Sequence, residues 1–465
     1  MLDTNIDISL KILSYRWKLS ISKKWVQFVI VIMTVLASTV ISYWGSPRIL
    51  MLIPIMIGGV GILLTLLKNI NIGFILILLS SIFIPFAGPG GVNAAVLMVV
   101  MLIGLWLMDM FVVKRYFRFI KSRTLLPVVI FLVLSVISFA MGQIPWFIFA
   151  NQAPLDAQIG GFAIFIFSLL LMIATAHLIQ DGKWLEIVVW FFIGLGSIYV
   201  FGRIFRLPVD RFYQRGFTAG SMFWTWLIAL SFGQLIFNRD LKTSVKGFLS
   251  ILVLATLYVA IVQAYDWKSG WLPPLAVIAV LVGLRHPRLI YLAIPIGLIT
   301  AGYLTSDLIA SDAYSWGTRV DAWFIVLTIS RASPLLGLGF SNYYWYTPLF
   351  PIRGWHVSFN SHSQYVDLIA QVGILGLLCF LWIFFEVGRL GWGLKNRLPD
   401  GFARSYTYSA LAGVVGTLVA AFLVDWVLPF AYNIGFEGFR ASILPWMFFG
   451  GLIGIEHLYQ NAVKT

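Results

Sequence analysis

The 465-residue sequence has few charged residues and only one cysteine. Charged side chains make up 11% of the chain, against about 25% in soluble domains, while 60% of the residues are hydrophobic. Together with a mean hydropathy of +0.93, this composition excludes a soluble globular protein, a disordered chain and a disulfide-stabilised scaffold. Cys379 has no second cysteine to pair with, so neither an intramolecular disulfide nor a multi-cysteine metal site can form.

Several motifs of common enzyme and transporter classes are also missing. The sequence contains no P-loop, no dinucleotide-binding glycine fingerprint, no HExxH motif and no acidic pair spaced for a metal. Acidic residues avoid the middle of the predicted spans, which disfavours a proton-relay pump, and no matched pair of broken helices indicates an inverted-repeat transporter. These absences favour an enzyme that acts at the outer face on an anionic, lipid-linked substrate.

Long apolar runs are what the sequence has in abundance. Lipid forces a backbone to satisfy its hydrogen bonds internally, so runs of about 17–25 apolar residues predict spanning helices. We predict an all-α, polytopic bundle of about 12–14 transmembrane helices, forming a single transmembrane domain over residues 1–465. The predicted spans are 26–44, 49–67, 72–87, 93–113, 126–142, 161–179, 184–202, 218–237, 247–265, 271–284, 289–304, 364–385, 406–427 and 442–457.

Basic residues set the predicted orientation. A basic N-terminal segment placed in the cytoplasm leaves most of the 32 Lys and Arg residues on that side once the spans alternate. Both termini are therefore expected to be cytoplasmic, and the net charge of +14 reflects orientation and not nucleic-acid binding. The first span lacks a small-residue cleavage site, so we expect an uncleaved anchor.

Some basic residues nevertheless fall on the predicted outer face. One reading is an outward-facing anion site, because arginine binds phosphate and carboxylate groups through paired hydrogen bonds. The other is that these side chains pair with Asp210, Asp307, Asp312 and Asp321 or contact lipid phosphates. The outer basic residues that raise the question are Arg203, Arg206, Arg211, Arg215, Lys268, Arg319, Arg331 and Arg353.

One predicted outer segment, the large extracytoplasmic loop 305–363, is much longer than the others. Loops of this length in compact bundles are usually functional. Within it, residues 319–331 place Val320, Trp323, Phe324 and Leu327 at helical spacing, which predicts an amphipathic helix at the outer membrane interface. The aromatic run 343–346 favours an interfacial belt, with stacking on sugar rings as the alternative.

Two histidines lie near the end of this loop. His362 precedes a predicted helix start and lies near arginines, so it is a candidate general base, with a helix-capping or interfacial role as the alternative. Tyr365, Asp367 and His356 are weaker candidates, because an interface or a helix start explains them adequately.

Four stretches resemble the O-antigen ligase and polymerase superfamily of bacterial envelope proteins. Residues 317–342 are similar to its pattern of Arg, Trp and then Pro-x-x-Gly-x-Gly, and residues 361–378 resemble its histidine motif ending in Gly-x-x-Gly. Residues 215–221 and 268–272 resemble two shorter segments. Ser363 stands where the family has Asn, and Lys268 stands near an expected Arg.

The resemblance implies an activity and a cell location. Members of this GT-C-like family transfer a glycan from undecaprenyl pyrophosphate to an acceptor hydroxyl at the periplasmic or outer face, inverting the anomeric centre without a metal. It implies that His362, Arg319 and Arg215 are catalytic, and that the diphosphate is bound by Arg215, Arg319, Lys268, Arg211, Arg206 and Arg203. No cofactor is implied, and the expected location is the bacterial inner membrane.

The sequence leaves several functions open. A ligase would transfer the glycan to a different acceptor such as a lipid A core, as in lipopolysaccharide assembly, whereas a polymerase would transfer it to another lipid-linked repeat unit. A flippase or transporter for a lipid-linked solute predicts arginines along a path across the bilayer, but the predicted arginines gather on one face. An interaction scaffold leaves the His362 and Arg319 motifs unexplained.

Metal independence is a testable consequence of the resemblance. Arginine, and not a divalent ion, would compensate the charge of the leaving pyrophosphate. Glycan transfer by the purified protein is therefore expected to proceed at an unchanged rate in excess EDTA. A loss of transfer that Mg²⁺ or Mn²⁺ restores would contradict this expectation.

Overall fold

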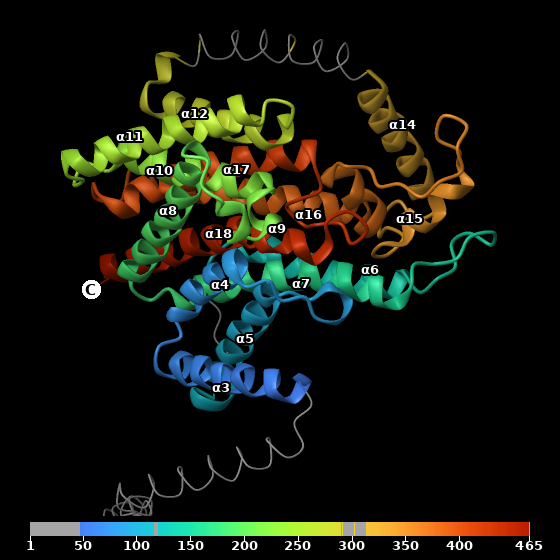
Figure 1. The fold of residues 1–465 in the computed structure, drawn as a ribbon, viewed down its shortest axis with the longest axis horizontal. Coiled ribbons are helices and arrows are strands. Elements are labelled where there is room, and N and C mark those ends of the chain that lie inside the picture. Colours follow the sequence, from blue (N-terminus) through green and yellow to red (C-terminus); the bar gives the residue numbers. More distant parts are fainter. Residues whose placement is uncertain (1–46, 116–119, 290, 292–301, 303–312, 465) are drawn as a thin grey trace, which may run out of the picture. The chain divides into compact units, whose positions relative to one another are not determined.

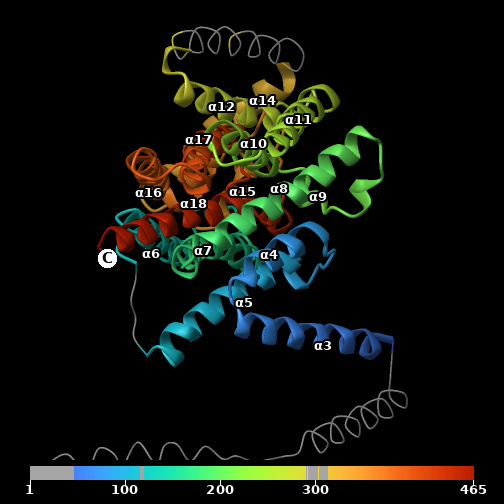
Figure 2. The ribbon, with the colours of Figure 1, turned by 90° about the vertical axis from the view of Figure 1, so that its left-hand side faces the viewer.

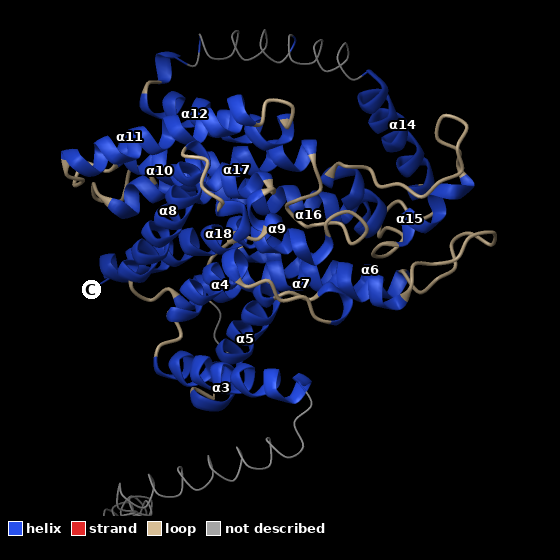
Figure 3. Cartoon of the chain, in the orientation of Figure 1, coloured by secondary structure: helices blue, strands red, loops and turns tan. Residues whose placement is uncertain are grey.

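The computed structural model describes residues 47–115, 120–289, 291, 302 and 313–464. These residues are mainly α-helices joined by loops, with no strands among them, which confirms the predicted all-α polytopic fold (Figure 3). The α-helices are α3 Pro47–Lys68, α4 Ile72–Phe83, α5 Ala94–Met108, α6 Leu125–Met141, α7 Leu155–Leu178, α8 Gly182–Ile204, α9 Arg215–Thr218, α10 Ser221–Phe237, α11 Thr243–Leu257, α12 Lys268–Arg285, α14 Ala313–Ser330, α15 Asn342–Tyr346, α16 Gln364–Leu394, α17 Phe402–Leu423 and α18 Gly435–Lys464.

Short helical segments of other types extend or connect these helices. The π-helical turns η2 Asp109–Val113 and η4 Tyr258–Gln263 continue α5 and α11. The 3₁₀ turns are η1 Pro89–Gly91, η3 Val209–Arg211, η5 Pro287–Leu289 and η6 Thr347–Leu349. Helix α3 belongs to one unit of the chain, Met1–Lys68, whereas every other element belongs to the second unit, Asn69–Thr465.

Eight helices in the described part of the chain are long and apolar enough to cross a membrane. Four shorter apolar helical stretches, 58–68, 72–83, 125–141 and 221–237, coincide with further predicted spans. The predicted span 26–44 and most of 289–304 lie outside the described residues. Helix α16 continues nine residues beyond its predicted end at 385, because Glu386 is buried within it and bonds Arg389 (2.7 Å) and Arg123 (3.3 Å).

Helices α5, α7 and α18 of the second unit run in the same direction and form a bundle. At their starts, the Asn93 side chain before α5 donates to the Phe436 carbonyl in α18, and Gly160 of α7 also lies against Phe436. At their far ends, Gly454 of α18 lies against Ile179, which follows α7. Figure 1 shows α7 and α18 side by side. Because α18 has 30 residues, the two ends of this bundle are about 45 Å apart.

A second group consists of α10, α12 and α17, which pack on one another, while α16 packs against α6 and α17 (Figure 2). The side chains in these contacts are mostly aromatic or small. The rings of Phe237 and Tyr408 stack 3.8 Å apart, and Gly413 of α17 lies against Trp226 of α10. Small residues allow helices to approach closely where lipid supplies no hydrophobic driving force.

Helix α16 is broken at Gly373, and segment 334–339 fills the break. Gly373 has φ 73° and ψ −178°, so the carbonyls and amides on either side of it cannot complete helical hydrogen bonds. The amides of Leu338 and Gly339 donate to the carbonyls of Ala370 (2.8 Å) and Gln371 (3.1 Å). In the other direction, the Ile374 amide donates to the Pro334 carbonyl (2.9 Å). The Pro-x-x-Gly-x-Gly and Gly-x-x-Gly motifs therefore bind each other through their backbones.

Glycine is required at this contact for two reasons. The backbone angles of Gly373 lie in a region that side-chain-bearing residues rarely occupy. A Cβ there would lie 2.1 Å from the Leu335 carbonyl oxygen, and one at Gly337 would lie 2.4 Å from the Gln371 backbone. Gly337 of one motif and Gly373 of the other thus serve a close backbone approach.

The large predicted loop is mostly ordered where it is described. The predicted helix 319–331 is present as α14, which begins earlier, at Ala313. Its Val326 and Ile329 are buried in the protein core, while Phe324 on the predicted interfacial face is 68% exposed. The predicted interfacial position of this helix stays a prediction.

The aromatic run in α15 has a different environment from either predicted one. Tyr343 and Tyr346 are fully buried in the protein core, and Tyr343 stacks on Phe430 at 4.8 Å. Tyr344 stacks on Tyr432 at 4.4 Å. Both the interfacial-belt and the sugar-stacking interpretations are wrong for the two buried tyrosines, because a tertiary contact that sequence spacing does not reveal covers them.

The broken helix predicts a position-specific effect of glycine substitution. Gly373→Ala should destabilise the protein by about 2 kcal/mol or more, because the strained backbone conformation and the clash with Leu335 add together. Gly388→Ala in the same helix is the matched control, since nothing lies within 4 Å of its Cβ position; it should be neutral or slightly stabilising. Thermal unfolding in detergent measures both. Equal unfolding midpoints would contradict the importance of the break.

Candidate active site

His362 projects from a tight turn just before α16. Its backbone is left-handed (φ 51°), an uncommon conformation for a residue with a side chain. The flanking serines hold the turn, because the Ser361 hydroxyl oxygen accepts a hydrogen bond from the Ser363 amide (3.0 Å) while its own proton is donated to Asp367 (2.7 Å). The Trp323 indole of α14 donates to the Ser361 carbonyl (2.8 Å). The turn is thus fixed to the helix that carries Arg319.

Arg319 lies close to both His362 and Asp425. Burial, and then the positive charge of Arg319, lower the pKa of His362 to about 4. Burial raises the pKa of Asp425 to about 6, and the same arginine opposes that rise. His362 is therefore neutral at physiological pH and can accept a proton, and the Arg319 charge acts on both titratable groups.

Two buried carboxyl groups, those of Asp367 and Asp425, lie next to the cluster formed by Arg319 and His362. Asp367 accepts hydrogen bonds from the hydroxyls of Tyr343 and Ser361 (2.7 Å for Ser361). Asp425 accepts from the Asn433 amide (2.6 Å). The second oxygen of each carboxyl is buried without a hydrogen-bond partner among the described residues. Unsatisfied buried acceptors are costly and are concentrated at functional sites.

Trp426 connects two further predicted segments to this region. Its ring lies 5.8 Å from that of Trp267, the residue before Lys268, and it also lies against Gly220, five residues after Arg215. Trp426 directly follows Asp425 in sequence. Residues from the four motif-bearing segments therefore converge at one end of the helices, around the chain segment 425–434.

Arg215 is exposed at the start of the short helix α9, which is anchored to α18. The Gly216 amide donates to Glu437 (3.2 Å), and a Cβ at Gly216 would clash with the Glu437 backbone. Glu437 in turn binds the fully buried Arg440 (2.9 Å). Arg440 donates to carbonyls at the end of α4, including those of Ser80 (3.1 Å) and Ile84 (3.1 Å). This chain of contacts fixes the position of the segment that carries Arg215.

Other predicted residues lie in different surroundings. Arg203 pairs with Asp210 (3.2 Å) and Arg353 with Asp321 (2.9 Å), while Asp307 and Asp312 lie outside the described residues. Lys268 is half-buried, and its ammonium lies 5.5 Å from the centre of the Tyr265 ring. The Tyr365 hydroxyl donates to the Leu418 carbonyl (2.8 Å), and His356 bonds the Pro348 carbonyl (2.8 Å). The exposed candidates are Arg206, Arg211 and Arg331.

A cavity of about 350 Å³ is lined by Thr318, the residue before Arg319 in α14. Arg353 and the exposed Trp355 also line it. The wall is held in place because the Arg353–Asp321 ion pair fixes the turn 352–355 against α14. The cavity offers space for a ligand within one residue of the arginine.

Comparison with known protein families finds a similarity in the region that carries these residues. Residues 227–381 match the model of the O-antigen ligase family. The match covers about a third of the chain and confirms the predicted resemblance to the O-antigen ligase and polymerase superfamily. It includes Lys268, Arg319, His362 and Asp367 and ends before Asp425. No curated protein matches the chain.

The family match supports a membrane glycosyltransferase of the ligase or polymerase type, with a lipid-linked glycan donor and an acceptor in a membrane. Among the described residues, no three His, Cys, Asp or Glu side chains are grouped so that they could hold a metal ion. Metal independence itself stays a prediction.

Sequence reasoning missed Asp425, Asn433 and Arg440. A signal for Asp425 was present, because an ionisable residue inside the apolar run 406–427 is a functional candidate by default. Asn433 and Arg440 gave no such signal. Arg440 bonds carbonyls of α4, which is far away in sequence, and Asn433 bonds Asp425, which was not itself recognised as a candidate.

Proposed function

We propose that this protein transfers a glycan from undecaprenyl pyrophosphate to an acceptor hydroxyl at the periplasmic or outer face of the bacterial inner membrane, as an O-antigen ligase-like enzyme. The observation that carries the proposal is the approach of Arg319 to a neutral His362. The two residues come from separate motifs, and the Trp323–Ser361 hydrogen bond joins the segments that carry them. The proposed orientation has both termini in the cytoplasm.

The proposed reaction is a single displacement. The acceptor oxygen forms a bond to the anomeric carbon while the bond from that carbon to the phosphate oxygen breaks, which inverts the configuration. The hydroxyl proton passes to His362, and undecaprenyl pyrophosphate leaves with the bonding electrons. Arg319 and Arg215 bind the diphosphate and stabilise the charge that develops on it, with Lys268 as a further contact. No cofactor takes part.

The electrostatics of the pair link donor binding to catalysis. In the free protein, the Arg319 charge holds the pKa of His362 down. A bound pyrophosphate places negative charge beside Arg319 and offsets that effect, so the pKa of His362 rises when the donor binds. The histidine therefore becomes a better base only when its substrate is present.

Asp425 and Asp367 are positioning residues in this proposal. Asp425 lies near Arg319 and carries negative charge above its pKa of about 6, which favours an orientation of the guanidinium towards the cluster. Asp367 fixes the Ser361 hydroxyl and thereby the turn that presents His362. Both act through the residues that contact substrate.

The pH dependence of transfer should differ between the free and the donor-bound enzyme. His362 must be neutral to accept a proton, so kcat/KM should fall steeply as the pH drops through the free-protein value, about 4, after a smaller decrease near pH 6 where Asp425 loses its charge. The acid limb of kcat should lie at higher pH, because donor binding raises that pKa. Initial rates over a broad pH range measure both. Coincident limbs at the ordinary histidine value of about 6.5 would contradict the proposed pair.

Arginine substitutions test the diphosphate contact. Arg319→Ala should lower transfer about a thousandfold, because a positioned arginine stabilises the leaving group in the transition state. Arg331→Ala is the matched control, since this exposed arginine lies just after the other end of α14; it should retain transfer. Both proteins should elute as folded monodisperse species. Normal turnover in Arg319→Ala would refute the diphosphate role.

The same assay separates ligase from polymerase, which is the alternative function. Reconstituted protein receives an undecaprenyl pyrophosphate-linked glycan labelled on the sugar. A ladder of longer lipid-linked products without a second acceptor identifies a polymerase. Transfer only after a lipid-core acceptor is added identifies a ligase.

A further inference from the structure

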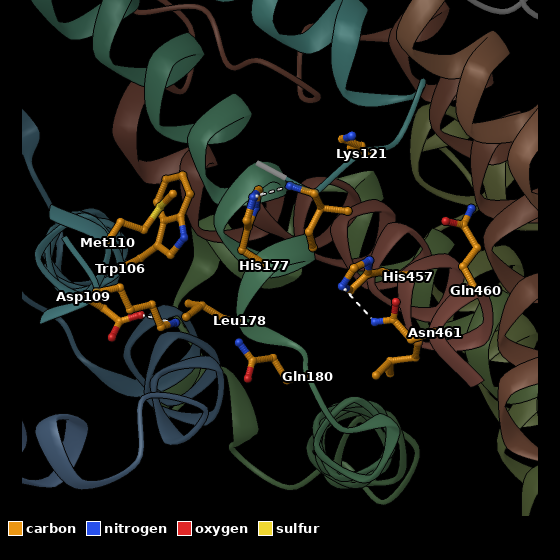
Figure 4. A pocket seen from close by; sticks show the side chains of 13 residues that line it. Trp106, Asp109, Met110, Lys121, His177, Leu178, Gln180, His457, Gln460 and Asn461 are labelled. Atoms are coloured by element: carbon orange, nitrogen blue, oxygen red, sulfur yellow. Dashed lines mark hydrogen bonds and ion pairs between the residues drawn. The ribbon is translucent and has the colours of Figure 1, made fainter. Parts of the chain in front are cut away.

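A second cavity lies at the end of the bundle away from the candidate active site. It occupies about 600 Å³ between the far ends of α5, α7 and α18, within the size range of ligand pockets. Figure 4 shows His177 near its centre, flanked by Trp106 and Met110 on one side and by His457 on the other. About 45 Å of α18 separates this end from the active-site end, so the cavity takes no part in the transfer chemistry.

The wall of the cavity is held in a fixed arrangement. His177 accepts a hydrogen bond from the Ile120 amide (2.9 Å) through one ring nitrogen and bonds the Ile173 carbonyl (2.8 Å) through the other. Its ring lies 5.3 Å from that of Trp106, which is almost fully buried. These contacts attach the segment that carries Lys121 to the ends of α5 and α7, so the cavity exists before any ligand binds.

The lining carries excess positive charge and many hydrogen-bond donors. Its one carboxylate, Asp109, is neutralised by Lys114 (2.6 Å). Lys121 is exposed and has no ion-pair partner among the described residues. The amide side chains of Gln180, Gln460 and Asn461 also line the cavity; the Gln460 amide donates one hydrogen to Glu456 (3.2 Å) and keeps a second, and the Asn461 amide bonds His457 (3.1 Å). A single ligand that uses an unpaired ammonium together with several amide donors is an oxyanion such as phosphate.

Helix ends alone do not explain the position of Lys121. Lysines commonly offset the negative ends of helix dipoles, and three helices end at this cavity. Lys121, however, lies four residues before α6, where the dipole of that helix disfavours a cation. The predicted orientation places Lys121 on the cytoplasmic side, and its position in the cavity lining makes its charge accessible to an anionic ligand.

The location also suits a ligand at the membrane surface. Two apolar spans, Ala94–Val112 and Leu155–Leu178, end at the cavity, and Met110 and Leu178 contribute apolar lining. A lipid headgroup lies at this level of a bilayer, with its phosphate beside its apolar glycerol ester region. We propose that this cavity is a binding site for a phosphate group carried by a lipid headgroup on the predicted cytoplasmic side.

The test uses the full-length protein in detergent and native mass spectrometry. Three probes are titrated: dioctanoyl phosphatidylglycerol, dioctanoyl glycerol, which lacks the phosphate, and inorganic phosphate, which lacks the lipid. Saturable binding of phosphatidylglycerol with no binding of dioctanoyl glycerol is the expected result. Equal binding of the two lipids would overturn the proposal. Inorganic phosphate that binds as tightly as phosphatidylglycerol would support the phosphate site but overturn the lipid as its source.

Matched lysine variants locate the binding. Lys121→Gln should weaken phosphatidylglycerol binding about tenfold, because one charge-assisted hydrogen bond is lost, and Lys121→Arg should retain it. Lys183→Gln removes an equally exposed lysine at the start of α8, outside the cavity lining, and should have no effect. Equal weakening by both glutamine variants would indicate diffuse surface charge and overturn the site. Gln180→Ala gives a second, uncharged test if Lys121→Gln misfolds.

Discussion

The break in α16 is the constraint on which the candidate active site depends. At Gly373 the helix stops forming its own hydrogen bonds, and the backbone of 334–339 supplies the missing partners. Arg319 lies in α14, and segment 334–339 follows that helix. The exchange therefore joins the α14 region to α16, the helix that follows His362. The two motifs that resemble those of the O-antigen ligase family are therefore also the means by which the proposed catalytic residues are held together. Gly337 and Gly373 allow the backbone contact, and the same stretches carry Arg319 and His362.

A site assembled from loop segments needs such a contact because loops are intrinsically more mobile than helices. His362 has a strained left-handed backbone, and it keeps this conformation because both neighbouring serines and Trp323 hold the turn. The strain is thus offset by hydrogen bonds to buried groups. A residue held in this way is already oriented before substrate arrives, which reduces the reorganisation needed during reaction.

The sequence predicted the all-α fold, the spans in the described region, α14 and the family, because apolar run length and motif spacing are local signals. It predicted the Arg319 and His362 segments through the motifs that carry them. It could not predict the burial of Tyr343 and Tyr346, the Arg440 contacts with α4 or the approach of Asp425 to Arg319. Each of these depends on residues far apart in sequence, and no periodicity within one segment records such a contact.

The two ends of the bundle differ in how their charged groups are arranged. At the active-site end, buried carboxyl groups lie close to an arginine, so a bound anion changes the balance between Arg319, His362 and Asp425. At the other end, the one lining carboxylate among the described residues, Asp109, is paired with Lys114, and Lys121 has no ion-pair partner in that part of the chain, so the proposed anion would bind there without shifting the pKa of His362. The helices α5, α7 and α18 connect the two ends as rigid elements. Occupation of the distant cavity by its proposed ligand would therefore stabilise the bundle by mass action, without contact with the proposed base His362.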